Sequence, residues 1–367
     1  MKVAVDKITL LILLGIIVVT TIAVVILQSI RPMITAEIRV TCEQINFDTP
    51  RPEANHPKVS LLNSGLWITK AKVSQFDRIL FKAPRSIRAT ELARLSDGTQ
   101  IVISPTSPNG HVTLSSSEEA FSLRDVFMES AARTSWGVHN TSQYILILNT
   151  EDQDQGELSA SFSTGDSLHF ILYNCAFLNH RGEMLYQTEQ DAEESFAFPV
   201  SFGQRQANVV AYSGQLELEI ESQPESYAEN IDVLRELPVK NVDYSKKEYS
   251  QTGEIRERNT IVTGVLKRPA YSLEDSVKIQ KGDFITATPG EGFLESLRAD
   301  SSSLVVSIKY DVRSMKIGPY RNAEHELVRS KLVTLWKNQT LIIIYTVSIA
   351  LFSLITNFIV RRKKEED

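Results

Sequence analysis

An uncharged apolar run near the end of the sequence limits the choice of fold more than any other feature. The run extends from Leu341 to Val360 and is followed at once by four basic residues, Arg361, Arg362, Lys363 and Lys364. An α-helix needs about twenty apolar residues to cross the hydrocarbon core of a bilayer. The run therefore predicts a transmembrane helix over residues 341–360, with Trp336 as an anchor at the membrane interface.

A second apolar run, from Ile8 to Ile30, predicts another transmembrane helix over residues 8–30. The alternative is a cleaved signal peptide, whose apolar stretch is usually about 7 to 15 residues. This run is longer, and the cleavage-like site Ile34-Thr35-Ala36 has a poorly fitting isoleucine. An uncleaved anchor is the preferred interpretation, and cleavage would leave one span with the same outer domain.

The orientation of such a protein follows from the basic residues beside the spans. Lys2 and Lys7 precede the first run, and the basic group 361–364 follows the second. Basic residues mark the cytoplasmic side of a membrane. The sequence thus predicts an integral membrane protein with both termini in the cytoplasm and a large extracytoplasmic domain, with a bacterial inner membrane and a periplasmic domain as the favoured setting.

The charge balance limits the partners of that domain. The chain has a formal net charge of −6, and both predicted cytoplasmic ends carry an excess of basic residues, so the segment between them is more acidic than the whole. An acidic surface repels the phosphates of nucleic acids. We therefore expect no nucleic-acid partner; the expected partners are membrane lipid and other membrane-protein subunits, or a second copy of the chain.

The segment between the apolar runs has the pattern of a mainly β protein. Ile38, Val40 and Cys42 alternate with polar residues, as in a half-buried strand. Further strands are predicted, among others, at Leu66–Ser74, Arg78–Lys82, Leu168–Leu178 and Ser303–Asp311. Many short strands with frequent turns indicate a β-sandwich-like region. The run Val59 to Ser74, with its Asn63-Ser64-Gly65 turn, is similar to extracellular immunoglobulin-like sandwiches, a resemblance that implies fold alone.

Helices are also predicted outside the spans. Ser116 and Glu119 have the spacing of a capping box, so a helix is predicted over Ser116–Arg133. Apolar residues at helical spacing predict a second helix before the last span, over 323–340.

The predicted fold class is therefore a mainly β extracytoplasmic region, with or without a second small β domain, plus two transmembrane helices. The predicted division is a cytoplasmic N-terminus (1–7), a first transmembrane helix (8–30), a β-rich domain (31–221), an irregular linker (222–259), a second β-rich region (260–322), a membrane-proximal helix (323–340), a second transmembrane helix (341–360) and a cytoplasmic tail (361–367).

The chain has two cysteines, Cys42 and Cys175. Two cysteines are too few for a disulfide framework, and their spacing fits neither a zinc ribbon nor a redox motif. A disulfide between them in an oxidising compartment and a pair of buried free thiols both remain open.

No catalytic, metal-binding or cofactor-binding motif is recognisable. The six histidines are scattered without HxH or HExxH spacing, and no GxSxG sequence is present. Pro289-Gly290-Glu291-Gly292 lacks the third glycine of a phosphate-binding loop, and Glu291 would repel phosphate. We therefore expect no enzyme activity, no metal and no cofactor.

The second apolar run has one face of small and polar residues. These residues are Thr346, Ala350, Ser353 and Asn357. Small residues allow helices to approach closely, and a polar side chain in lipid seeks a partner. The face predicts a helix-packing interface with the first apolar run or with another subunit, although chance alignment would produce the same pattern.

Two functions agree with these features. The first is a non-enzymatic, membrane-anchored structural or interaction subunit whose outer β-domain docks on a larger membrane or surface complex. The alternative is a sensor module that binds a small ligand or glycan and signals through the second transmembrane helix.

Overall fold

The structure, a computed structural model, is mainly β, and the part of the chain that it describes contains one short helix. It describes residues 19–49, 59–60, 66–82, 100–116, 121–128, 132–140, 143–149, 157–162, 167–179, 181–188, 196–201, 207–212, 215–221, 231–249, 254–268, 276–300, 302–320, 325–328 and 333. Every strand pairing described is antiparallel, and most strands belong to one large sheet.

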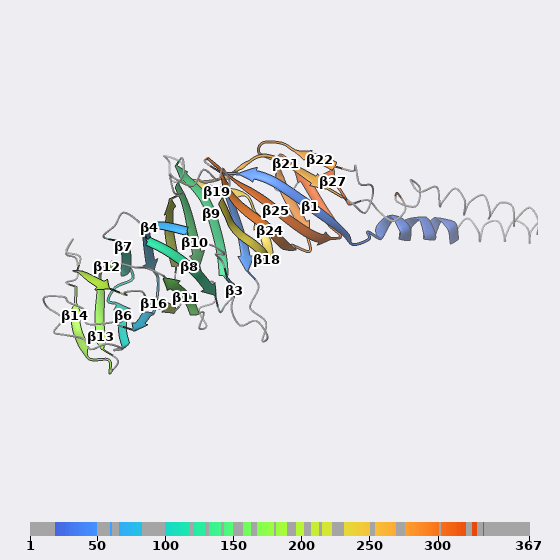
Figure 1. Cartoon of the computed structure of the whole chain (residues 1–367). Helices are drawn as coiled ribbons and strands as arrows, with labels where there is room; N and C mark the ends of the chain where they lie inside the picture. Colours follow the sequence, from blue (N-terminus) through green and yellow to red (C-terminus); the bar gives the residue numbers. More distant parts are fainter. Residues whose placement is uncertain are drawn as a thin grey trace, which may run out of the picture.

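The sheet consists of two groups of strands (Figure 1). The terminal group comes from both ends of the described chain: β1 (Ile34–Cys42), β2 (Gln44–Thr49), β18 (Ile231–Asp243), β21 (Ile261–Lys267), β22 (Ser276–Ile279), β24 (Glu291–Asp300) and β25 (Ser303–Val312).

The central group comes from the middle of the chain: β3 (Val59–Ser60), β4 (Leu66–Ser74), β5 (Arg78–Lys82), β6 (Gln100–Pro105), β7 (His111–Ser116), β8 (Phe121–Met128), β9 (Ala132–Asn140), β10 (Gln143–Asn149), β11 (Glu157–Phe162), β12 (Ser167–Tyr173), β13 (Cys175–Asn179), β14 (Met184–Gln187), β15 (Phe196–Ser201), β16 (Ala207–Tyr212) and β17 (Gln215–Glu221).

The strand order shows that the central group is an insertion into the terminal group. The terminal group runs β22–β21–β1–β25–β24–β18–β2, so that β1 pairs with strands from the far end of the chain. β2 then pairs with β9, and the sheet continues through β10 and β17 to β4. The predicted 31–221 segment therefore shares its first two strands with the C-terminal part of the sheet.

Alternating side chains explain why β1 and β25 form the centre of the terminal group. Ile34, Ala36, Ile38, Val40 and Cys42 of β1 are buried, and the residues between them face outward. β25 alternates in the same way and pairs with β1 over its whole length. Since a fully buried aliphatic side chain contributes roughly 1.5–3 kcal/mol, the shared apolar face of these strands holds the group together.

A small second sheet covers part of this face. It contains β23 (Phe284–Thr288), β26 (Ser314–Gly318) and β27 (His325–Glu326). Met315 and Ile317 are buried in the same core as β25, and Ile285 and Ala287 pack against it. Two layers therefore meet here, and a two-stranded hairpin, β19 (Ser245–Tyr249) and β20 (Ile255–Asn259), extends beside them.

The prediction of two transmembrane helices is wrong for the described chain. Helical residues run over 19–29, which corresponds to a rise of roughly 16 Å. Within the described ranges, no helix is long and apolar enough to span a bilayer. This finding contradicts the predicted fold class, the two-pass architecture and the integral membrane location with cytoplasmic termini. Residues 8–18 of the first predicted span and the whole second predicted span, 341–360, lie outside the described residues.

Parts of the other predicted helices and of the predicted linker form strands in the described residues. The interior of Ser116–Arg133 forms β8, which pairs with β11 on one side and with β3 and β4 on the other. The stretch 222–259, expected to be irregular, contains β18, β19 and β20. At the start of the predicted helix 323–340, His325–Glu326 forms β27 and pairs with β26.

Candidate functional site

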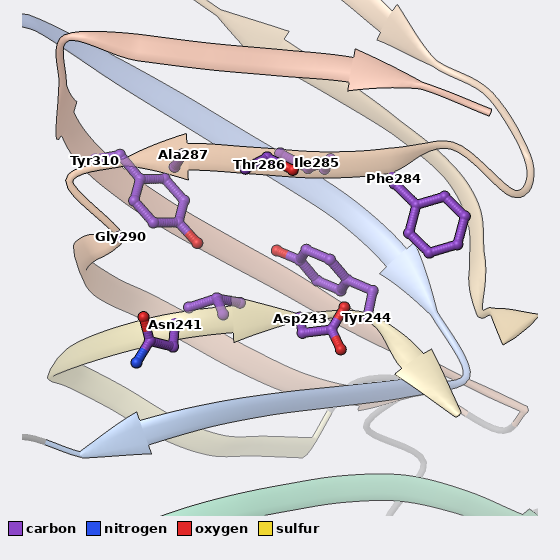
Figure 2. Close-up of a pocket in the computed structure, with 10 residues that line it drawn as sticks. Asn241, Asp243, Tyr244, Phe284, Ile285, Thr286, Ala287, Gly290 and Tyr310 are labelled. Carbon is purple, nitrogen blue, oxygen red and sulfur yellow. The ribbon is translucent and has the colours of Figure 1, made fainter. Parts of the chain in front are cut away.

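A pocket lies between the two layers, where β18 ends beneath β23 and beside β25 (Figure 2). We call it the tyrosine pocket. Its volume is about 210 Å³. Its walls are formed by Asn241, Val242, Asp243, Tyr244, Phe284, Ile285, Thr286, Ala287, Gly290 and Tyr310. Ligand pockets are commonly larger, about 300–1,000 Å³, so this one suits a small molecule or a single protruding group.

The position of Tyr244 is fixed by hydrogen bonds of its backbone. Tyr244 lies between β18 and β19. Its carbonyl oxygen accepts hydrogen bonds from the Thr260 amide nitrogen at 2.8 Å and from Thr260 Oγ1 at 2.6 Å. The next carbonyl, that of Ser245, accepts from Asn46 Nδ2 at 2.7 Å. Because the backbone is held on both sides, the Tyr244 side chain is directed into the space between the layers.

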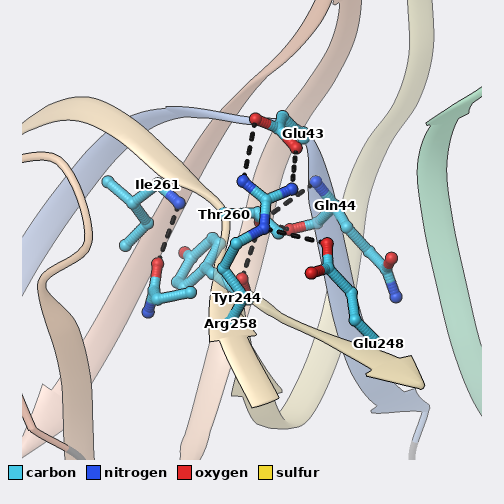
Figure 3. A network of polar contacts seen from close by, with 8 residues as sticks. Glu43, Gln44, Tyr244, Glu248, Arg258, Thr260 and Ile261 are labelled. Atoms are coloured by element: carbon cyan, nitrogen blue, oxygen red, sulfur yellow. Dashed lines mark hydrogen bonds and ion pairs between the residues drawn. The ribbon is translucent and has the colours of Figure 1, made fainter. Parts of the chain in front are cut away.

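An ion-pair network reinforces the same corner from outside (Figure 3). The Arg258 guanidinium donates to Glu43 through Nη2 at 2.6 Å and to Glu248 through Nε at 3.0 Å. Glu43 lies between β1 and β2, whereas Arg258 and Glu248 belong to the β19–β20 hairpin. The network therefore connects the hairpin to the strands that support Tyr244.

Tyr310 reaches the pocket from β25, where its ring lies over a glycine. Tyr310 pairs with Gly292 of β24. A Cβ atom on Gly292 would lie 2.7 Å from two carbons of the Tyr310 ring and 3.0 Å from the Lys309 carbonyl oxygen. A side chain at position 292 would collide with the ring, so Gly292 allows Tyr310 to occupy its place.

Asn241 and Gly290 close one end of the pocket. Asn241 has a φ of 49°, in the left-handed region that asparagine tolerates better than most residues. Its amide nitrogen donates to the Gly290 carbonyl oxygen at 2.9 Å, and its Nδ2 donates to Asp48 Oδ2 at 2.9 Å. The first bond connects the end of β18 to the loop between β23 and β24, and the second connects it to β2.

The two tyrosine hydroxyl groups point toward one another across the pocket (Figure 2). Tyr244 is 2% exposed and Tyr310 is 4% exposed. Burial raises the pKa of both phenols above the ordinary value, and for Tyr244 nearby Tyr310, Cys42 and Asp243 raise it further. Both are neutral phenols at physiological pH. The Tyr244 hydroxyl forms no hydrogen bond with any described residue.

Asp243 lies beside Tyr244 at the end of β18. Ser245 Oγ lies within hydrogen-bond distance of Asp243 Oδ2 and 2.6 Å from Glu257 Oε1. A serine hydroxyl has one hydrogen to donate, so it cannot donate to both carboxylates at once. Of the pocket-lining residues, Asp243 is the charged one.

Within the described residues, no group of three or more His, Cys, Asp or Glu side chains could hold a metal ion. The tyrosine pocket thus offers two neutral hydroxyl groups, an acidic wall and apolar surfaces from Val242, Ile285 and Ala287. This combination suits recognition of a small polar group with an apolar body.

The residues that the sequence singled out are not among the described residues that line the pocket. The predicted helix-packing face, Thr346, Ala350, Ser353 and Asn357, lies outside the described residues, as do Trp336 and the basic residues Arg361, Arg362, Lys363 and Lys364. Cys42 and Cys175 are both buried, free thiols in β1 and β13. Burial raises the pKa of the Cys175 thiol to about 12 and raises that of Cys42 as well.

The pocket residues were not recognised from the sequence because Asn241 to Tyr244 fell in the expected linker. One feature of the sequence did point to this region. The glycines of Pro289-Gly290-Glu291-Gly292, considered above as an incomplete phosphate loop, lie at the pocket wall and beneath the Tyr310 ring. Their role in this structure is close packing.

Comparisons with known proteins identify no family. No protein-family model and no curated protein matches the chain. A solved scytalido-glutamic peptidase with a peptide-based transition-state analog aligns at 7% identity over 76% of this chain and 98% of that chain, with a TM-score of 0.15. SCP-B, a member of the Eqolisin family of peptidases in complex with the tripeptide Ala-Ile-His, aligns at 7% identity with the same coverage and a TM-score of 0.13. Scores this low carry no argument about fold or activity.

Proposed function

We propose that this chain is a non-enzymatic binding protein whose tyrosine pocket holds a small organic ligand group. The observation that carries the proposal is the Tyr244 hydroxyl, which is buried, faces the pocket and has no hydrogen-bond partner among the described residues. Leaving a buried hydroxyl unsatisfied costs roughly 1–3 kcal/mol. A ligand that hydrogen-bonds this group would remove that cost, and the free energy recovered would contribute to binding.

The chemistry of the lining residues favours binding over catalysis. No histidine is among the described residues that line the pocket, and both of its tyrosines are held in the neutral form by burial. Cys42, close to Tyr244, is also held as an unreactive thiol because burial raises its pKa. Among the described residues near the pocket, there is thus no activated nucleophile of the thiolate or phenolate kind.

The proposal is tested with three four-carbon probes of similar shape: n-butanol, n-butylammonium and butyrate. Each is titrated into the full-length protein while the free energy of unfolding is measured by urea denaturation. A ligand that binds the folded state stabilises it by about 2.7 kcal/mol at one hundred times its Kd. We expect at least one probe to stabilise the protein saturably.

Two variants localise the effect. Tyr244→Phe removes the pocket hydroxyl, and Tyr320→Phe removes a hydroxyl from a residue that is 76% exposed and lies outside the pocket lining. Stabilisation by the probe should decrease in Tyr244→Phe and persist in Tyr320→Phe. Failure of all three probes to stabilise the wild-type chain, or equal stabilisation of both variants, would refute the proposed binding site.

A further inference from the structure

We infer that the tyrosine pocket binds an uncharged carbonyl group, whose oxygen accepts one hydrogen bond from each of the two tyrosine hydroxyl groups. The inference rests on the proposed binding function. Three features of the described residues carry it: the Tyr244 hydroxyl has no partner among them, the Tyr310 hydroxyl faces it across the pocket, and apolar side chains line the space beside both.

The two hydroxyl groups face one another without being bonded to each other. They point toward the same space, yet the Tyr244 hydroxyl forms no hydrogen bond with any described residue, Tyr310 included (Figure 2). Among the described residues, no hydrogen-bond partner of the Tyr310 hydroxyl is found either, and burial is the cause of its raised pKa. A ligand atom between the two oxygens is therefore the group that bonds to both.

The hydrogens of the two phenols require an acceptor. Burial keeps both phenols neutral, so each has one hydrogen to donate. A carbonyl oxygen has two lone pairs and no hydrogen, so it can accept from Tyr244 and Tyr310 at once and adds no donor that needs a partner. An ammonium cannot accept and would leave both phenol hydrogens unsatisfied, and an alcohol adds a hydrogen of its own. Buried donors without a partner are rare in native proteins, which favours the carbonyl.

The space beside the hydroxyl groups suits a short carbon chain better than water. One water molecule needs roughly 10–15 Å³ of cavity volume. The pocket has about 210 Å³, and Val242, Ile285 and Ala287 line it with side chains that form no hydrogen bonds. A single bridging water would leave most of this space unfilled, whereas the alkyl groups of a ketone or an amide would cover the apolar walls.

Charges of both signs surround the pocket, so charge does not select the ligand. Asp243 is the charged lining residue, and the β19–β20 hairpin beside it carries basic and acidic side chains. These are Lys246, Lys247, Arg256 and Arg258, together with Glu248, Glu254 and Glu257. An ion that enters the pocket gives up its hydration, and burying a charge is costly unless the charge is paired and hydrogen-bonded. Two neutral phenols are better matched to an uncharged group.

Butanone and sec-butanol test the inference on the wild-type protein, because the two molecules share a carbon skeleton and differ at the oxygen. Each is titrated into the full-length protein during urea unfolding, with n-butylammonium as a probe that only donates. We expect butanone to bind at least about tenfold more tightly than the other two, whose hydrogens need additional partners. Equal or tighter binding of sec-butanol or n-butylammonium would overturn the carbonyl inference and leave the binding function intact. Absence of binding by every probe would instead refute the binding function.

The carbonyl carbon of bound butanone reports its hydrogen bonds directly. Its NMR resonance, observed with an isotopic label at that carbon, moves downfield as the oxygen accepts hydrogen bonds. We expect the resonance of the bound ketone to lie at or downfield of its position in water, because two phenols donate to the oxygen. A resonance near the position in an alkane would contradict the assignment.

Tyr244→Phe and Tyr310→Phe each remove one of the two donors, and Tyr320→Phe, at a position that is 76% exposed, is the matched control. Each pocket variant should bind butanone about tenfold more weakly and should move its carbonyl resonance upfield. The control should retain the affinity and the resonance of the wild type. Unchanged affinity and resonance in both folded pocket variants would overturn the inference.

Ketones and amides both present an uncharged carbonyl, and propanamide separates these two sources. It has the shape of butanone, with an amino group in place of one methyl group. Tighter binding of propanamide than of butanone would support the site and assign it to amides. Weaker binding of propanamide, with butanone still bound, would support the site and assign it to ketones.

Discussion

The Tyr244 hydroxyl makes a quantitative prediction about stability. Its ring is buried beside Tyr310 and Cys42, and its oxygen has no described hydrogen-bond partner. Tyr244→Phe keeps the buried ring and removes the unsatisfied group. Since an unsatisfied buried hydroxyl costs roughly 1–3 kcal/mol, we expect the ligand-free variant to be more stable than the wild type by about 1 kcal/mol.

A second tyrosine in the same protein provides the opposite case. The Tyr144 hydroxyl donates to the Asp300 carbonyl oxygen at 2.6 Å. Tyr144→Phe removes that bond and leaves the carbonyl without it, so the variant should lose about 1 kcal/mol. Tyr320→Phe, at an exposed position, should change the free energy of unfolding little.

Urea unfolding of the four proteins, monitored by circular dichroism, measures these differences. They should appear as shifts of the urea midpoint, with no change in the dependence of the unfolding free energy on urea concentration. The expected order of stability is Tyr244→Phe, then wild type and Tyr320→Phe together, then Tyr144→Phe. If Tyr244→Phe proved as unstable as Tyr144→Phe, the Tyr244 hydroxyl would be hydrogen-bonded in solution, and the reasoning from an unsatisfied group would fail.

Three further predictions concern packing, pH and thiol reactivity. Gly292→Ala should destabilise the fold by about 1–3 kcal/mol and weaken probe binding, because its Cβ would meet the Tyr310 ring at 2.7 Å; a neutral effect on both would contradict this packing. Burial alone raises the pKa of the Glu326 carboxyl, but hydrogen bonds from Ser314, Met315 and Val328, together with the Arg31 guanidinium, hold it below its ordinary value. A carboxyl whose pKa is lower in the folded than in the unfolded state stabilises the fold above the unfolded pKa, and this stability is lost as pH falls through the folded pKa. The thermal midpoint of wild type should therefore drop more than that of Glu326→Gln between about pH 6 and pH 3. Parallel curves of thermal midpoint against pH for the two proteins would refute this prediction. Cys42 and Cys175 should react with a thiol reagent only on unfolding, because both are buried with raised pKa values; rapid labelling of the native chain would contradict their burial.

Several strands of this protein were readable from local patterns. Leu66–Ser74 and Arg78–Lys82 were predicted with the bounds that β4 and β5 have, and the prediction is confirmed. The predicted Leu168–Leu178 corresponds to β12 and β13, separated at Asn174, which has a φ of 49°. Alternation of apolar and polar side chains is a property of one segment, and it needs no partner to be recognised.

Two predicted helices conflict with strand pairing in their described residues. The capping-box spacing at Ser116 and Glu119 indicated a helix, but residues 121–128 pair on both sides and form β8. Helix propensity and capping contribute on the order of 1 kcal/mol, which the hydrogen bonds and packing of a strand between two neighbours can exceed. The same holds for His325–Glu326, which joins β26 and binds Arg31 through Glu326.

Residue order along the chain thus specified the β class and the place of many strands, since both follow from the two-residue period of side chains. It indicated membrane helices that the described residues do not contain. The tyrosine pocket emerges from tertiary structure: Tyr244, Phe284 and Tyr310 come from different segments and meet only because β18, β23 and β25 pack in two layers. Gly292 shows why the sequence alone did not reveal the pocket. Its lack of a side chain matters only once the Tyr310 ring on the neighbouring strand is in place.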